Sequence, residues 1–153
     1  MRNLVPALFG WVVLNQLGLP VPACPTLVGA GIFLGRGDGS LPLILSVAVI
    51  GTLLADLAWF GIGRWHGSGA IDRLAKLARR SPEWMKRAED RYHDHKVLFL
   101  LAAPFLPAVN PFASGLAGAL GMRLSAYLLC ALGSAVAWTV VWVGVGYMSS
   151  HLF

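Results

Sequence analysis

The chain has 153 residues, of which 57% are hydrophobic and 12% charged, and its twelve Lys and Arg exceed its seven Asp and Glu to give a net charge of +5. Soluble domains carry about 25% charged residues, so the composition excludes a soluble globular class and predicts an integral membrane protein. The basic residues flank apolar segments, so we expect membrane lipids with anionic headgroups as partners, and no nucleic acid.

The first apolar segment, residues 3–35, is interrupted near its middle by three prolines, Pro20, Pro22 and Pro25. One straight helix of this length would measure about 50 Å, whereas a hydrocarbon core is about 30 Å thick. Because proline breaks helix interiors, we predict two legs joined by a re-entrant bend, surrounded by protein or a watery cavity. The Val21–Cys24 stretch loosely resembles a lipoprotein cleavage site, but a proline beside the cut fits poorly, and we expect the segment to be retained.

The second segment, residues 41–63, is predicted to be a conventional span, with Ser40 placed to cap it and Pro42 in its first turn. Asp56 is its only charged residue. A carboxylate near mid-membrane costs about 2.5–3.5 kcal/mol on insertion scales and should face protein or water. Two interpretations of Asp56 stay open: a proton-exchanging group, or a structural residue bonded to the backbone of the broken segments.

A polar stretch follows. Residues 64–96 contain nine Lys or Arg and five acids, so the positive-inside bias places them in the cytoplasm. We predict amphipathic helices on the membrane surface over residues 66–96, with a restart at Ser81-Pro82 and one face made by Trp84, Ala88 and Tyr92. Arg64 either anchors the second segment at the interface or donates to a phosphate.

The third segment, residues 97–122, again contains three prolines, Pro104, Pro107 and Pro111, and we predict a second re-entrant bend there. The fourth, residues 124–147, is a clean span. Asn15 precedes the first bend and Asn110 lies within the second. Their amides either satisfy freed backbone groups or contact a polar headgroup.

The two halves of the sequence are similar. Each has a proline-broken apolar segment, then small residues, then an intact span ending in Gly-x-Gly, at Gly61–Gly63 and Gly144–Gly146. Paired interrupted segments of this kind indicate a transporter site between internal repeats. The predicted fold is thus an all-α integral membrane protein, one membrane domain over residues 1–153, with two re-entrant helical hairpins, transmembrane helices in an internal, inverted repeat, and a cytoplasmic amphipathic segment.

Catalytic and metal signals are weak. His93-Asp94-His95 and His66 have no second cluster at ligand spacing, and a solvated helix end explains them equally well. The sequence offers no nucleophile elbow, phosphate-cradling glycine loop or paired carboxylates. We therefore expect no metal, no cofactor and no enzymatic activity.

Three stretches cover most of the chain in order: GLPVPACPT at residues 18–26, ADLAWFGIGR at 55–64 and PFLPAVNPFASGLAGALGM at 104–122. They resemble the DedA family of small bacterial membrane proteins, also called SNARE-associated or VTT-domain proteins. The resemblance implies two facing re-entrant hairpins and movement of a lipid, a polyprenyl phosphate or a phospholipid, across the bilayer, with proton coupling in some members. Asp56, Gly63 and Arg64 match positions of the family.

The sequence also departs from the family pattern. Asn15 stands where an acid is typical, residues 22–25 replace the usual Pro-Gly-Glu-Thr, and Pro104 and Asn110 stand at the places of two arginines. The proline-rich first bend is similar to a branch whose members often carry a rhodanese-like sulfurtransferase domain.

Two functions follow from the resemblance. The first is a lipid transporter, flippase or scramblase, with a cavity between residues 20–26 and 104–114 and a substrate or proton site made by Asp56, Arg64, Asn15 and Asn110. The alternative is a non-transporting scaffold or partner subunit that keeps the fold without the family's charged residues. We expect a multi-pass protein of the bacterial cytoplasmic (inner) membrane, whose Gly and Ala faces allow a homo-oligomer.

Overall fold

The computed structural model describes residues 4–17, 23–37, 39–67, 69, 72–73, 76, 79–106 and 109–152. Every regular element among these residues is helical, which confirms the all-α expectation. The elements in chain order are α1 (Leu4–Gln16), α2 (Ala23–Gly35), α3 (Leu41–His66), α5 (Pro82–Asp94), α6 (Lys96–Ala102), the 3₁₀ helix η1 (Ala103–Phe105), α7 (Asn110–Ala119) and α8 (Leu124–Ser150).

The chain divides into two compact units, which are described separately. Unit 1 comprises residues 1–55 and 135–153, and unit 2 comprises residues 56–134. The long helices α3 and α8 each contribute one half to each unit. Each unit therefore combines one pair of short apolar helices with two half-helices. The single membrane domain stays a prediction.

Among the described helices, α3 and α8 are long and apolar enough to cross a membrane. They contain the predicted spans 41–63 and 124–147 and continue three residues beyond each, to His66 and Ser150. Both expose large apolar side chains, such as Ile50 and Leu129, which are 53% and 73% accessible. Water would penalise such a surface, whereas lipid tails accommodate it.

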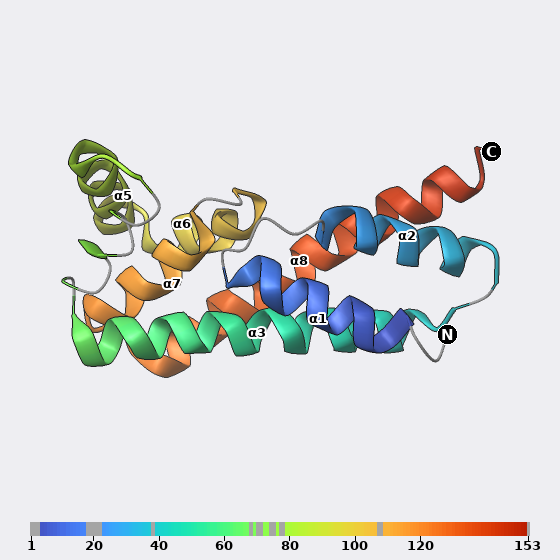
Figure 1. Ribbon diagram of the computed structural model, residues 1–153, viewed down its shortest axis with the longest axis horizontal. Coiled ribbons are helices and arrows are strands. Elements are labelled where there is room, and N and C mark those ends of the chain that lie inside the picture. The colour runs from blue at the N-terminus through green and yellow to red at the C-terminus, as the bar shows by residue number, and fades with distance from the viewer. Residues whose placement is uncertain are drawn as a thin grey trace. The chain divides into compact units, whose positions relative to one another are not determined.

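In unit 1 the short helices α1 and α2 lie side by side and run in opposite directions (Figure 1). Each has 13 residues, a length of about 20 Å, so neither alone crosses a hydrocarbon core of about 30 Å. Pro25 occupies the first turn of α2, where its missing N–H costs no helical hydrogen bond. Pro20 and Pro22 lie outside the described residues, and the re-entrant bend stays a prediction.

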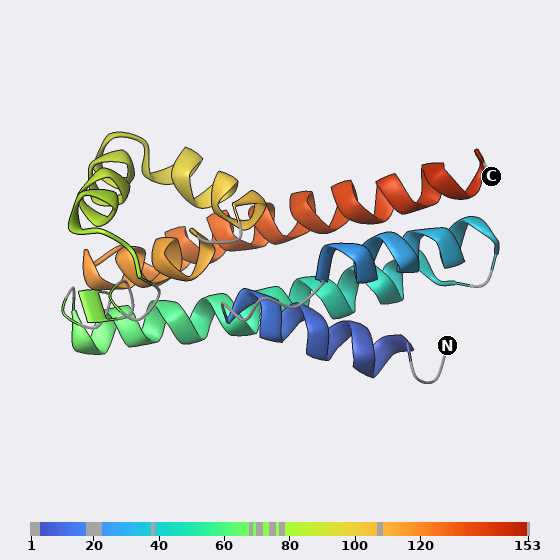
Figure 2. The ribbon, with the colours of Figure 1, turned by 45° about the horizontal axis from the view of Figure 1, so that its top comes forward.

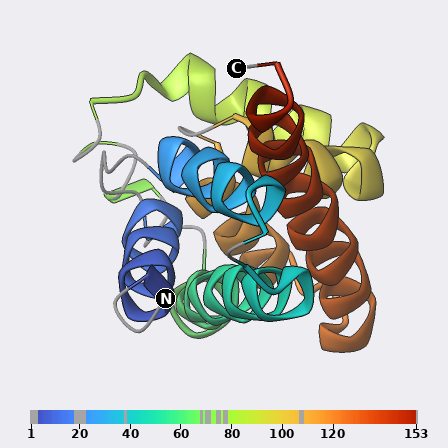
Figure 3. The same cartoon turned by 90° about the vertical axis from the view of Figure 1, so that its right-hand side faces the viewer.

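Apolar side chains form the core of unit 1. Leu8 and Val12 of α1 pack with Leu27 of α2 and Trp138 of α8 in one buried cluster. Viewed from its end, the unit shows α1 and α2 beside the first half of α3 (Figure 3). The side chains of Phe9 and Val12 approach Gly51 of α3, where a smaller residue leaves room for α1.

Helix α2 crosses the second half of α8 at two glycines. A Cβ atom placed on Gly31 would lie 3.0 Å from the Cα atom of Gly146, and one placed on Gly146 would lie 3.0 Å from the Cα atom of Gly31. Carbon atoms normally approach to about 3.5–4.0 Å. The two backbones are therefore in direct contact, and any side chain at either position would separate them.

In unit 2 the third apolar segment is broken, as its prolines predict. Helix α6 ends at Ala102, η1 contains Pro104, and α7 begins at Asn110 with Pro111 in its first turn. Helices α6 and α7 pack together and run in opposite directions (Figure 2). Pro107 lies outside the described residues, and the placement of this bend within a membrane stays a prediction.

Helix α7 is the most deeply buried element of unit 2, with every residue from Asn110 to Gly118 buried. It crosses the end of α3 through glycines. A Cβ atom on Gly63 would lie 3.0 Å from the Cα atom of Gly115, and one on Gly118 would lie 2.9 Å from the backbone nitrogen of Arg64. The run of small residues in α7 is what permits this approach.

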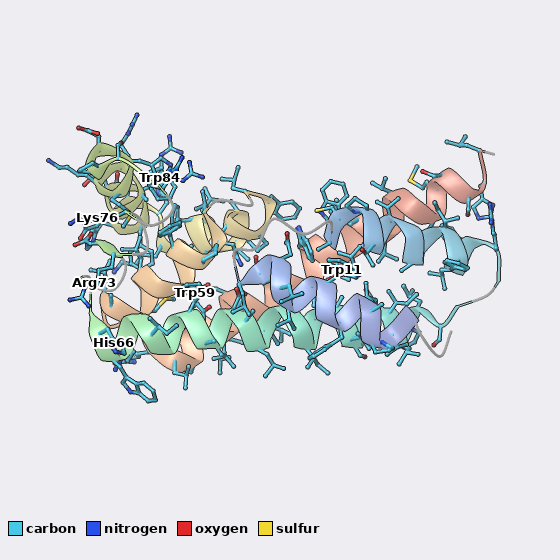
Figure 4. The ribbon with its side chains drawn as sticks, viewed as in Figure 1. Trp11, Trp59, His66, Arg73, Lys76 and Trp84 are labelled. Atoms are coloured by element: carbon cyan, nitrogen blue, oxygen red, sulfur yellow. The ribbon has the colours of Figure 1, made fainter. Side chains whose placement is uncertain are left out.

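Helix α5 confirms the predicted restart. Ser81 is the N-cap residue and its hydroxyl accepts a hydrogen bond from the Trp84 backbone N–H at 3.2 Å, with Pro82 as the first helical residue. Ala88 and Tyr92 are buried and Trp84 is half-buried, so the predicted apolar face is also confirmed. Of the preceding residues 66–80, several lie outside the described part, and Arg73 and Lys76 are helical and exposed (Figure 4).

Candidate functional site

Asp56 is the centre of a polar cluster in unit 2. It lies in the apolar helix α3, and its side chain is 3% exposed. A carboxylate withdrawn from water is costly unless donors surround it. Its neighbours therefore decide what this residue can do.

Two donors from α7 reach the same carboxylate oxygen. The Asn110 amide nitrogen Nδ2 donates to Asp56 Oδ1 at 2.9 Å, and the Ser114 hydroxyl donates to Oδ1 at 3.4 Å. Asn110 and Ser114 are four residues apart and so share one face of α7. Hydrogen bonds to charged groups contribute about 1.5–3 kcal/mol each, so this pair offsets much of the cost of burying the carboxylate and fastens α7 to α3.

Tyr127 joins α8 to the same position. Its hydroxyl donates to the backbone carbonyl of Asp56 at 3.1 Å, and its ring stacks on Phe60 with centroids 4.3 Å apart. Residue 56 is thus held through its side chain by α7 and through its backbone by α8. A shift of any one of the three helices in unit 2 disturbs at least one of these bonds.

A small cavity of about 10 Å³ adjoins Asp56, lined also by Asn110, Ser114, Tyr127 and Ser134. This volume is at the lower limit for one water molecule, which needs about 10–15 Å³. The Ser134 hydroxyl donates to the carbonyls of Leu100 and Leu101 at 3.3 and 3.1 Å. In this conformation the cluster accommodates a proton or one water, and it is too small for a lipid headgroup.

Arg64, the second predicted site residue, lies apart from this cluster. It follows Asp56 by eight residues on the same helix, about 12 Å at the helical rise. Its side chain is exposed, and its Nη1 donates to the backbone carbonyl of Met122 at 3.3 Å. Arg64 therefore fastens the end of α3 to the turn between α7 and α8, where Gly121 has a φ of +75°.

Asn15, the remaining predicted residue, belongs to α1 and to unit 1, where it is half-buried. The neighbouring Gln16 is the buried one, and its amide nitrogen donates to the Thr52 hydroxyl of α3 at 3.5 Å. This bond links α1 to α3 within unit 1. The structure thus brings Asp56 and Asn110 together and places Arg64 and Asn15 elsewhere.

Sequence reasoning did not assign roles to Ser114, Tyr127 and Ser134. Ser114 carries a signal, because it follows Asn110 at the spacing of one helical turn. Tyr127 and Ser134 are seven residues apart on α8, the spacing of two turns on one face, and each is a hydroxyl within an apolar span. Within the described part of the chain, no three His, Cys, Asp or Glu residues lie close enough to hold a metal ion.

The chain is similar to several bacterial membrane proteins. It is 27% identical over 141 residues to the uncharacterized membrane protein slr0232 of Synechocystis, covering 92% of this chain and 65% of that protein. It is 26% identical over 140 residues to the uncharacterized membrane protein YbfM of Bacillus subtilis, covering 92% and 86%. It is 28% identical over 131 residues to the uncharacterized membrane protein Rv2637 of Mycobacterium tuberculosis, covering 83% and 60%. The chain thus spans less than two thirds of the first and third of these relatives.

No solved structure matches the chain significantly. The family model of the VTT domain matches residues 21–148, which include most of α2, the whole Asp56 cluster and nearly all of α8. The two candidate spans and the relatives agree in making this a membrane protein. The chain belongs to the VTT-domain family, also called the DedA family.

Proposed function

We propose that the protein is a membrane transporter that moves a lipid, a polyprenyl phosphate or a phospholipid, across the bilayer. The observation that carries this proposal is the buried carboxylate of Asp56, which binds the fully buried helix α7 through Asn110 and Ser114. A scaffold needs no charge at this depth, and intramembrane carboxylates typically belong to ion or substrate pathways.

The proposed mechanism uses Asp56 as a latch. When the carboxylate is ionised, it accepts from Asn110 and Ser114 and holds α7 against α3. Protonation removes the charge that makes these bonds strong and so loosens α7. Movement of α7 then opens a path for the lipid, with Arg64 at the exposed end of α3 as a contact for its headgroup.

Both short helix pairs are proposed to be re-entrant hairpins of an inverted repeat. Two observations support this. The helices α1, α2 and α7 have 13, 13 and 10 residues, too few to cross a bilayer one by one. The glycine crossings of the units also correspond: Gly31 of α2 meets Gly146 of α8, and Gly118 of α7 meets the turn of α3 that ends at Gly63 and Arg64. We further propose the bacterial cytoplasmic membrane as the location, with α5 on the cytoplasmic side.

The test is lipid translocation in vesicles that contain the purified protein. The Asp56→Asn variant keeps the size of the side chain but removes its charge, and we expect translocation of a fluorescent lipid to fall to the rate of protein-free vesicles. Thr139→Val is the matched control, because Thr139 is a buried polar residue of the other long helix whose Oγ1 has no hydrogen-bond partner among the described residues. Full translocation by Asp56→Asn would refute the latch.

One observation favours a second function. The cavity beside Asp56 measures only about 10 Å³, as expected of a structural polar cluster in a non-transporting scaffold or partner subunit. The same vesicles separate the two functions. A scaffold leaves lipid translocation at the background rate for the unaltered protein, whatever the lipid or the pH gradient.

A further inference from the structure

Unit 2 contains a second and much larger cavity, on the far side of α7's partner helices from Asp56. It has a volume of about 520 Å³ and lies between α5 and the segment from His95 to Val109. Ligand pockets for small molecules are typically about 300–1,000 Å³. None of its lining residues belongs to the Asp56 cluster.

The wall that α5 contributes is basic. Arg87 and Arg91 line the cavity one turn apart, and His95 follows after the helix ends. None of the ten described lining residues is acidic, although α5 carries four acids, Glu83, Glu89, Asp90 and Asp94. The helix therefore sorts its charges, with two guanidinium groups at the cavity and the carboxylates on its other faces.

The opposite wall is apolar. It is made by Leu98, Phe99 and Ala102 of α6 together with Leu106 and Val109. Leu98 and Leu106 are 65% and 51% exposed, so the apolar wall continues onto the outer surface of the unit. The cavity is thus amphipathic, with cationic donors along one side and an open hydrocarbon surface along the other.

The cationic wall is ordered by its neighbours. The Arg87 Nε donates to the Glu83 backbone carbonyl at 3.2 Å, and the remaining guanidinium N–H groups are on the Nη atoms at its tip. Trp84, which also lines the cavity, packs edge-on against Phe112 of α7 at 5.2 Å, and Arg80 covers its ring at 5.1 Å. Figure 4 shows Trp84 on the side of α5 that faces α6. A rigid basic wall binds an anion with little loss of side-chain freedom.

We propose that this cavity binds one anionic membrane lipid. Its phosphate lies between Arg87 and Arg91, whose planar guanidinium groups match phosphate oxygens, and an acyl chain lies along Leu98, Ala102 and Leu106. The proposal does not depend on lipid transport, because it uses only the membrane location and residues outside the Asp56 cluster. The site would fix α5 to the membrane surface.

The experiment is native mass spectrometry of the detergent-purified protein titrated with phosphatidylglycerol or with phosphatidylcholine. We expect one phosphatidylglycerol to bind tightly and phosphatidylcholine to bind weakly. Arg87→Gln/Arg91→Gln should lower the affinity for phosphatidylglycerol about tenfold or more, since it removes both charged donors. Arg73→Gln/Lys86→Gln is the matched control, because it removes the same charge from exposed helical residues that do not line the cavity. Equal losses in the two double variants would overturn the proposal.

A second variant tests the apolar wall. Ala102→Phe fills part of the cavity without changing any charge, and we expect it to weaken phosphatidylglycerol binding by a similar factor. Inorganic phosphate should compete poorly in the unaltered protein. If phosphate displaces the lipid at equal concentration and Ala102→Phe has no effect, the site binds a free anion and the lipid proposal is wrong. Asp56→Asn should bind phosphatidylglycerol normally, so failure of the transport proposal leaves a separate result here.

Discussion

Two glycines on one turn of α3 should respond oppositely to the same substitution. A Cβ atom on Gly63 would lie 3.0 Å from the Cα atom of Gly115, whereas one on Gly61 meets nothing within 4 Å. Because carbon atoms need about 3.5–4.0 Å, Gly63→Ala must push α7 away by about 0.5–1 Å. Overpacking of this kind costs about 1–3 kcal/mol.

Both variants gain the same helix propensity, about 0.8–1.0 kcal/mol for alanine over glycine. Gly61→Ala should therefore stabilise the protein slightly, and Gly63→Ala should be less stable than Gly61→Ala by the overpacking cost alone, about 1–3 kcal/mol. The free energy of unfolding is measured in mixed micelles by circular dichroism against increasing SDS. If the two variants agree within about 0.5 kcal/mol, the direct backbone contact of α3 with α7 is refuted.

Three further predictions follow from the same contacts. Asn110→Ala removes the shorter bond to Asp56 and should cost about 1.5–3 kcal/mol, and a double-mutant cycle with Asp56→Ala should give a coupling of that size, whereas additive effects would contradict the bond. Ser81→Ala removes the N-cap of α5 and should cost about 1 kcal/mol, seen as faster amide exchange at Trp84; unchanged exchange there would argue against the cap. In unit 1, Gly31→Ala should destabilise the protein and its neighbour Gly29→Ala should not, because a Cβ atom on Gly29 meets nothing within 4 Å; equal unfolding free energies would exclude the crossing of α2 with α8.

Hydropathy and proline placement predicted much of the secondary structure. The break in the third segment, the restart at Ser81 and both long spans follow from local chemistry that sequence displays directly. The ends of the spans were placed three residues early because hydropathy falls where polar residues begin. Backbone hydrogen bonds continue past that point, through Arg64 to His66 on α3.

The site was predicted only in part. Asp56 and Asn110 were singled out because polar groups are costly in apolar segments, but their contact joins residues 54 positions apart and depends on how α7 rotates against α3. Tyr127 was missed because a tyrosine in a span is often an interfacial residue, and nothing local indicates that its hydroxyl reaches the carbonyl of Asp56. For the same reason, the Gly-x-Gly pattern did not reveal which glycine of each pair touches another helix.

The glycine contact of α3 with α7 also bears on how unit 2 can move. Main chain resting on main chain contains no rotamers that must change when one helix tilts over the other, so the crossing acts as a smooth fulcrum. Asp56 lies seven residues from Gly63, about 10 Å along α3, and α7 is therefore a lever pinned at one end by glycine and gripped at the other by a carboxylate. Release of that grip swings α7 about its pinned end without detaching it.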